Sequence, residues 1–161
     1  MPDSNDSDAR APVTRRTALL TGLSLALPGL TAATPLTNVE VWKGPDCDCC
    51  TEWARHLEAN GFRVTAHADG NADARRRLGM PIELGSCHSA RVEGYALEGH
   101  VPAREIQRLL KERPDAIGLA VPAMPRGTPG MDGPSVRGAR DPYDVLLVLR
   151  DRRWRVYQSY A

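Results

Sequence analysis

The segment from residue 38 to residue 57, NVEVWKGPDCDCCTEWARHL, decides the expected fold. Its first residues alternate between apolar and polar side chains, and this period of two predicts a β-strand. Gly44-Pro45 then turns the chain. Cys50, Trp53 and Leu57 follow at a spacing that places them on one face of an α-helix. A cluster of cysteines therefore lies where a strand and a turn lead directly into a helix.

Beyond this stretch the chain continues to switch between strand and helix patterns. Alternating apolar side chains predict further strands, and Pro102 and Pro114 stand where a helix would begin and end. In chain order we expect a strand over residues 62–66, a short helix over 71–78, a hairpin over 89–101, a helix over 102–113, and a closing hairpin of strands 145–149 and 154–157.

The order strand, helix, strand, helix, hairpin, helix is typical of thioredoxin-like and glutaredoxin-like proteins. A helix that links the first two strands predicts that they are parallel, and the later hairpin is antiparallel. We therefore expect an α/β protein with a three-layer thioredoxin-like (glutaredoxin-like) fold and a C-terminal β-hairpin extension. In that architecture the entrance of the first helix holds the active thiols, because a helix N-terminus favours the thiolate.

Residues 118–142 are rich in glycine and proline and predict one long loop. A loop of this length inside a compact domain is typically functional or disordered. It carries Met124 and Met131 in glycine- and proline-rich surroundings rather than on a helical stripe. Burial in a core therefore does not readily explain these two methionines.

Residues 1–34 have the composition of an export signal. Arg15-Arg16 precede an apolar run that is shorter than the roughly 20 residues of a transmembrane helix. The paired arginines predict a twin-arginine-type signal peptide. We therefore expect a periplasmic mature domain over residues 35–161, with no membrane association after the signal is cleaved.

Charge and motifs exclude several classes of function. The formal net charge is +1, and a near-neutral domain lacks the basic surface expected of a nucleic-acid-binding protein. The sequence has no GxSxG, no HExxH and no phosphate-binding glycine loop. Hydrolytic chemistry and nucleic-acid binding are thus unsupported.

The distribution of the four cysteines favours a soft-metal site. Cys47, Cys49 and Cys50 crowd into four residues, and Cys87 is followed at once by His88. Thiolates select copper(I), zinc or iron–sulfur centres, and thioethers are further ligands for copper(I). We expect copper(I), with silver or zinc as alternatives, and add Met124 and Met131 to the candidate ligands.

Two other interpretations of these cysteines remain open at this point. Cys47 and Cys50 satisfy the C-x-x-C spacing of thiol–disulfide oxidoreductases. Exported proteins also use cysteines as structural disulfides, in which case Cys47 or Cys49 would bridge to Cys87. Cys50, on the apolar helix face, is either a ligand or a core residue.

Two histidines near these cysteines have different expected roles. His88 is a candidate ligand because it adjoins Cys87. His100 lies between Gly99 and Val101-Pro102, from where it could point toward the site, but capping of a helix or a structural hydrogen bond is the expected role.

The motifs together resemble a known bacterial family. They are Cys47-Asp48-Cys49-Cys50 with Trp53, Ser86-Cys87-His88-Ser89-Ala90, Glu93-Gly94-Tyr95, Glu98-Gly99-His100-Val101-Pro102, and residues 118–125 with Gly127, Pro129, Gly130 and Met131. This combination, over roughly residues 38–160, resembles the family called domain of unknown function 411. The resemblance implies a periplasmic, thioredoxin-like metal-binding protein often associated with copper or silver resistance. It implies metal ligation by Cys47, Cys49, Cys50, Cys87 and His88, with assistance from Met124 and Met131.

From the sequence we therefore expect a copper(I)-binding protein that acts in metal sequestration, transfer or resistance and is not an enzyme. Its partners would be the metal ion and other periplasmic copper proteins. The alternative is a thioredoxin-like thiol–disulfide oxidoreductase that uses Cys47 and Cys50.

Overall fold

The computed structural model describes residues 35–161, so the predicted signal peptide lies outside the described residues. Seven strands and three α-helices are present in this part of the chain, with two short 3₁₀ turns. The elements are β1 (Thr37–Lys43), α1 (Asp48–Ala59), β2 (Phe62–His67), α2 (Ala72–Arg77), η1 (Ile82–Leu84), β3 (His88–Val92), β4 (Tyr95–Glu98), α3 (Ala103–Glu112), β5 (Ala116–Ala120), η2 (Pro134–Val136), β6 (Tyr143–Leu149) and β7 (Trp154–Tyr160).

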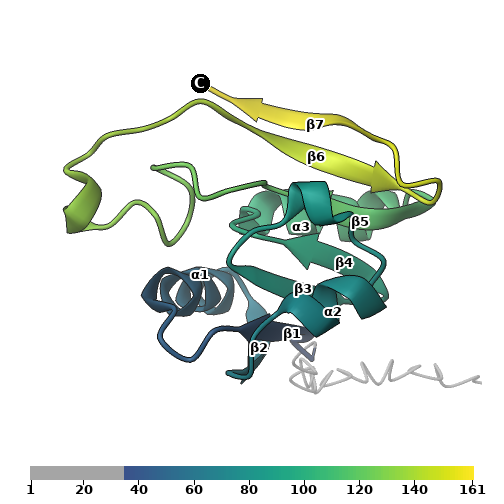
Figure 1. Cartoon of the computed structure of the whole chain (residues 1–161), viewed down its shortest axis with the longest axis horizontal. Coiled ribbons are helices and arrows are strands. Elements are labelled where there is room, and N and C mark those ends of the chain that lie inside the picture. Colours follow the sequence, from purple (N-terminus) through teal and green to yellow (C-terminus); the bar gives the residue numbers. More distant parts are fainter. Residues whose placement is uncertain (1–34) are drawn as a thin grey trace, which may run out of the picture. The chain divides into compact units, whose positions relative to one another are not determined.

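All seven strands belong to one sheet, in the order β2-β1-β3-β4-β5-β6-β7. β1 and β2 are parallel, as expected for two strands linked by α1. β3 is antiparallel to both of its neighbours, β1 and β4. β4 and β5 are parallel, and β6 and β7 continue the sheet as the predicted antiparallel C-terminal hairpin (Figure 1).

Apolar side chains fill both faces of the sheet, so the described domain has three layers. On one face α1 and α3 contribute Trp53 and Ile106 to a core that also holds Val39 and Leu97 from the strands. On the other face the segment that contains α2 and η1 covers a smaller apolar cluster around Met80. In the part of the chain that is described, no helix is long and apolar enough to cross a membrane.

The prediction of a single loop over residues 118–142 is wrong at its start. Residues 116–120 form β5, and all five are buried. The segment AIGLA lacks the apolar–polar alternation of a half-exposed strand because both of its faces are covered. The loop therefore begins at Val121, and η2 interrupts it near its far end.

Gly118 allows β5 to lie against β4. A Cβ atom built at Gly118 would lie 1.7 Å from the carbonyl oxygen of Ala96, its partner across the parallel pair. No side chain fits between these two backbones, and the strand is locally irregular between Ala116 and Gly118. The same parallel pair attaches the C-terminal hairpin to the rest of the sheet.

We expect Gly118→Ala to lower the free energy of unfolding by at least about 2 kcal/mol, because overpacking against backbone cannot be relieved by moving a side chain. Denaturant unfolding followed by circular dichroism measures this change. Gly133→Ala is the control, since a Cβ atom at Gly133 meets nothing within 4 Å. Equal stability of the two variants would contradict the close approach of β4 and β5.

Candidate metal centre

Three segments converge at one end of the sheet. The first is the junction of β1 and α1, where Cys47 caps the N-terminus of α1 and Cys49 and Cys50 lie in its first turn. The second is the start of β3, with Cys87 and His88, and the third is the turn after β4. Because β3 is antiparallel to both neighbours, its start lies beside the ends of β1 and β4. The pairing of Lys43 with His88 and of Ser89 with Glu98 fixes this arrangement.

The four cysteine sulfurs all lie within 4.8 Å of one another. The Sγ atom of Cys49 is 3.6 Å from that of Cys47 and 3.9 Å from that of Cys87. Cys50 is fully buried on the apolar face of α1, beside Trp53 and Leu57. Its sulfur nevertheless belongs to the same group, so Cys50 is both a core residue and a candidate ligand.

The structure shows the cysteines in a partly oxidised state. Cys47 and Cys50 form a disulfide, whereas Cys49 and Cys87 are free thiols. The predicted alternative of a staple from Cys47 or Cys49 to Cys87 is therefore wrong for this state. The disulfide also withholds two of the four predicted metal ligands, since a metal binds the thiolate.

His88 lies beneath the first helix and next to Cys87. Its ring is fully buried, with its centroid 4.3 Å from that of Trp53. Nδ1 lies 3.4 Å from the Cys87 sulfur, and Nε2 has no hydrogen-bond partner among the described residues. A buried ring nitrogen without a partner is costly, so Nε2 of His88 is a polar atom that a further group could satisfy.

His100 is a site residue that the sequence analysis did not assign to the metal centre. Its Nε2 lies 3.1 Å from the Cys87 sulfur, closer than Nδ1 of His88. Its Nδ1 lies 2.8 Å from the carbonyl oxygen of Pro129. Donation from Nδ1 leaves Nε2 free to face the sulfur, which is the usual arrangement of a metal-binding histidine. The signal that could have revealed it is its position just after β4, whose end lies beside Cys87.

Burial sets the protonation states around Cys87. Loss of solvent, followed by the nearby Cys49, raises the pKa of the Cys87 thiol to about 12. Burial lowers the pKa of His100, and burial together with the neighbouring His100 lowers the pKa of His88 well below its ordinary value. At neutral pH both imidazoles are uncharged and can act as ligands, whereas a metal must displace the Cys87 proton.

The loop that begins at Val121 covers the cysteines. A Cβ atom at Gly130 would lie 2.5 Å from the carbonyl oxygen of Cys49 and 2.8 Å from the amide nitrogen of Trp53. Gly130 also has a φ of +85°, which disfavours any other residue. The loop backbone therefore rests directly on the first turn of α1, and the contact of Pro129 with His100 holds it there.

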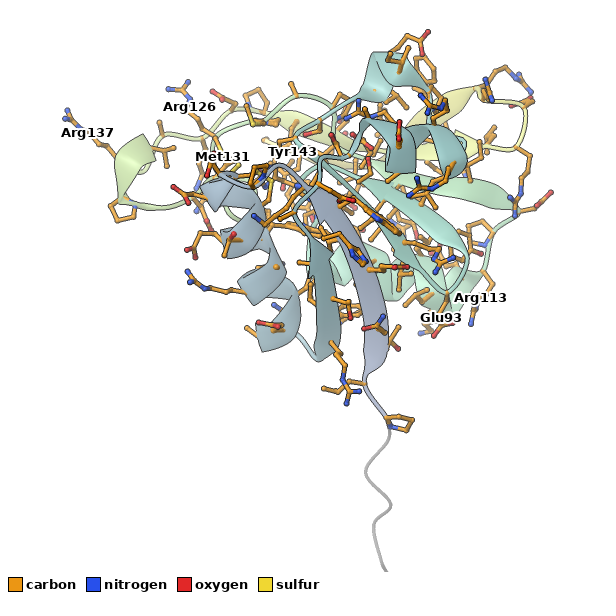
Figure 2. The ribbon with its side chains drawn as sticks, turned by 60° about the horizontal axis from the view of Figure 1, so that its bottom comes forward. Glu93, Arg113, Arg126, Met131, Arg137 and Tyr143 are labelled. Atoms are coloured by element: carbon orange, nitrogen blue, oxygen red, sulfur yellow. A yellow bond between two sulfur atoms is a disulfide. The ribbon has the colours of Figure 1, made fainter. Side chains whose placement is uncertain are left out.

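The two candidate methionines of this loop differ in position. Met131 lines a cavity of about 480 Å³ together with Cys49 and carboxylate-bearing residues such as Asp48 and Asp132. Figure 2 shows Met131 beside the first turn of α1. Met124 is 49% exposed and does not line this cavity. Met131 thus shares a cavity with Cys49, and Met124 does not.

Comparisons with known proteins agree with this site. A profile of the family described as protein of unknown function DUF411 matches residues 84–131. A solved structure described as copper resistance protein CopG, Form 2, is 41% identical, with a TM-score of 0.72 over 79% of this chain and 100% of that chain. Form 1 of the same protein is 41% identical, with a TM-score of 0.71 over 78% of this chain and 98% of that chain. A search of curated proteins gave no match.

The fold and the site define a mixed α/β protein with two adjoining groups of candidate metal ligands, the four cysteines and the set Cys87, His88 and His100, which share Cys87. The likeness to CopG extends over nearly the whole described domain. The chain belongs to the DUF411 family, a copper-related family, as its sequence motifs predicted.

We expect protein purified without reductant to contain two alkylatable thiols, on Cys49 and Cys87, and four after reduction. Alkylation with iodoacetamide, followed by mass spectrometry of peptides, counts and locates them. The expected product is a peptide with an internal disulfide between Cys47 and Cys50. A link between Cys49 and Cys87 instead would contradict the pairing described above.

Proposed function

We propose that this protein binds a soft metal ion as cargo, copper(I) in the first place, and sequesters or transfers it in the periplasm. The observation that carries the proposal is the convergence of four cysteine sulfurs within 4.8 Å of one another. Thiolate sulfur is the donor that copper(I) prefers, and silver and zinc share this preference in part. The two solved structures that it resembles are described as copper resistance proteins.

The residues present fit such an ion. In the reduced protein Cys47, Cys49, Cys50 and Cys87 supply thiolates, and His88 offers a ring nitrogen beside Cys87. His100 joins Cys87 and His88 in a second group of candidate ligands. Met131 assists from the loop, and Met124 assists only where the loop moves. The ion would supply the positive charge that keeps the crowded thiolates deprotonated.

Several finer features of the proposal rest on sequence arguments. The paired arginines and the apolar run before residue 35 support export to the periplasm. The element order supports a thioredoxin-like ancestry for the first part of the sheet, which β5, β6 and β7 extend. We infer a binding role rather than catalysis, with metal passed to other periplasmic copper proteins by exchange of ligands.

One observation favours a second candidate function, thiol–disulfide exchange. Cys47 and Cys50 form a disulfide at the entrance of α1, with Cys47 partly exposed and Cys50 buried. A disulfide with one accessible sulfur at a helix N-terminus is the arrangement of an oxidoreductase. In this case the protein would oxidise or reduce the thiols of a partner.

We expect the reduced protein to bind copper(I) under anaerobic conditions and to give a colourless complex. Cys47→Ser combined with Cys49→Ser should lower the apparent affinity by more than about 100-fold, because loss of supporting residues alone can cost about 10–100-fold. Competition with a chromophoric copper(I) chelator measures the affinity, and elemental analysis gives the stoichiometry.

The matched control for that experiment is the same protein in its oxidised state, with the Cys47–Cys50 disulfide intact. It should bind copper(I) more weakly than the reduced form, since two ligands are withheld. Reduced protein that takes up neither copper(I), silver(I) nor zinc(II) would contradict the proposed function. Turnover in an insulin-reduction assay that is lost in Cys47→Ser alone would favour the second candidate.

Substitution of each methionine in turn tests whether the loop keeps its position when the ion binds. Met131→Leu should weaken copper(I) binding several-fold, because its thioether lines the cavity at Cys49. Met124→Leu should leave the affinity unchanged, since its side chain lies outside that cavity. The same chelator competition measures both. An effect of Met124→Leu as large as that of Met131→Leu would show that the loop rearranges around the ion.

A further inference from the structure

Glu98, the last residue of β4, is a fully buried carboxylate next to the metal centre. Its Oε1 atom accepts hydrogen bonds from the backbone N–H of Ser86, at 2.7 Å, and from Nε of Arg75, at 2.9 Å. Its Oε2 atom accepts from the hydroxyl of Ser89, at 2.6 Å. The carboxylate is thus fully satisfied by three residues that come from α2 and from the two sides of Cys87-His88.

These contacts fix the backbone on both sides of the candidate ligands. Ser86 immediately precedes Cys87, and Ser89 immediately follows His88. Arg75 donates a second hydrogen bond, of 2.6 Å, to the carbonyl oxygen of Ser86, so both polar backbone groups of that residue are held by side chains. Ser86 lies before β3 and forms no strand pairing. The side chains of Glu98 and Arg75 supply the hydrogen bonds that a neighbouring strand would otherwise give to its backbone.

Glu98 also joins this segment to His100. The backbone N–H of Gly99 donates to the carbonyl oxygen of His88, at 3.0 Å. A Cβ atom at Gly99 would lie 2.6 Å from Oγ of Ser86 and 2.4 Å from the carbonyl oxygen of Val121. The turn that carries His100 is therefore packed tightly against the segment that carries Cys87, and Glu98 holds the two together.

Stability alone does not explain a charge in this position. Burial raises the pKa of Glu98 in spite of the Arg75 guanidinium and the Ser89 and Ser86 donors, so this position favours the ionised form less than water does. A buried ion pair often contributes no more stability than well-packed apolar residues of similar volume. The pair does fix the orientation of the groups that donate to it, because a carboxylate accepts hydrogen bonds with a defined geometry.

We propose that Glu98, held by Arg75, is the positioning residue that fixes Cys87 and His100 in the geometry of the metal centre. This inference rests on the proposed function for its metal-binding consequence. It has a second consequence that needs no metal, because a loosened Ser86–Ser89 segment exposes the Cys87 thiol.

The test is Glu98→Gln compared with Glu105→Gln. Glu105 is the matched control, because it is also a fully buried glutamate, lies in α3, and accepts a hydrogen bond from the hydroxyl of Tyr160 at 2.8 Å. Both variants lose a buried carboxylate, so both lose stability. Only Glu98→Gln removes the charge that pairs with Arg75 and holds Ser86 and Ser89.

Two measurements are made on reduced protein. In the absence of metal, alkylation of Cys87 by iodoacetamide is timed by mass spectrometry against that of Cys49 in the same sample. We expect the ratio of the two rates to rise at least threefold in Glu98→Gln and to stay at the native value in Glu105→Gln. With silver(I) as probe, competition should show an affinity loss of about 10–100-fold in Glu98→Gln only.

The two measurements separate the positioning role from the proposed function. A native protein that binds no silver(I), copper(I) or zinc(II) refutes the proposed function, and the alkylation ratio then still decides the positioning role. An alkylation ratio in Glu98→Gln equal to that in Glu105→Gln overturns the inference. Should Glu98→Gln fail to fold, Ser89→Ala removes one hydrogen bond to the carboxylate and is judged by the same ratio, with Ser159→Ala, an exposed serine, as its control.

Discussion

The antiparallel pairing of β3 with both β1 and β4 is the constraint on which the site depends. It brings the start of one strand beside the ends of two others, and each of the three positions contributes donor atoms. Cysteines that are nearly 40 residues apart in the chain therefore meet, with sulfurs 3.9 Å apart. The parallel β1–α1–β2 unit adds the helix entrance, whose free N–H groups favour thiolates.

Much of this arrangement was predictable from the sequence, since strong periodicity and Gly/Pro punctuation mark most elements. The β1–α1 junction, the β3–β4 hairpin, α3 and the closing hairpin all lie where the pattern placed them. β5 was missed because a short strand buried on both faces has no alternation, and its central Gly118 resembles a loop residue. The juxtaposition of the four cysteines agreed with the sequence, whereas their oxidation state did not follow from it.

His100 and Glu98 show what single-sequence reasoning leaves out. Both belong to a motif of the family, but neither adjoins the cysteines in sequence, and both contact partners that are distant in the chain, namely Cys87, Arg75 and Pro129. Their roles depend on strand register, which spacing alone does not determine. Membership of the DUF411 family was predicted from motifs, whereas the different positions of Met124 and Met131 required coordinates.

The location of Trp53 has a practical consequence. Its indole is fully buried, donates to the carbonyl oxygen of Val101 at 2.8 Å, and lies over His88. The other two tryptophans lie in different surroundings, since Trp42 stacks on His67 and Trp154 is 45% exposed. Trp53 is therefore a fluorescence reporter of the site, because a heavy ion bound among these sulfurs would quench the emission of a buried tryptophan that packs against His88.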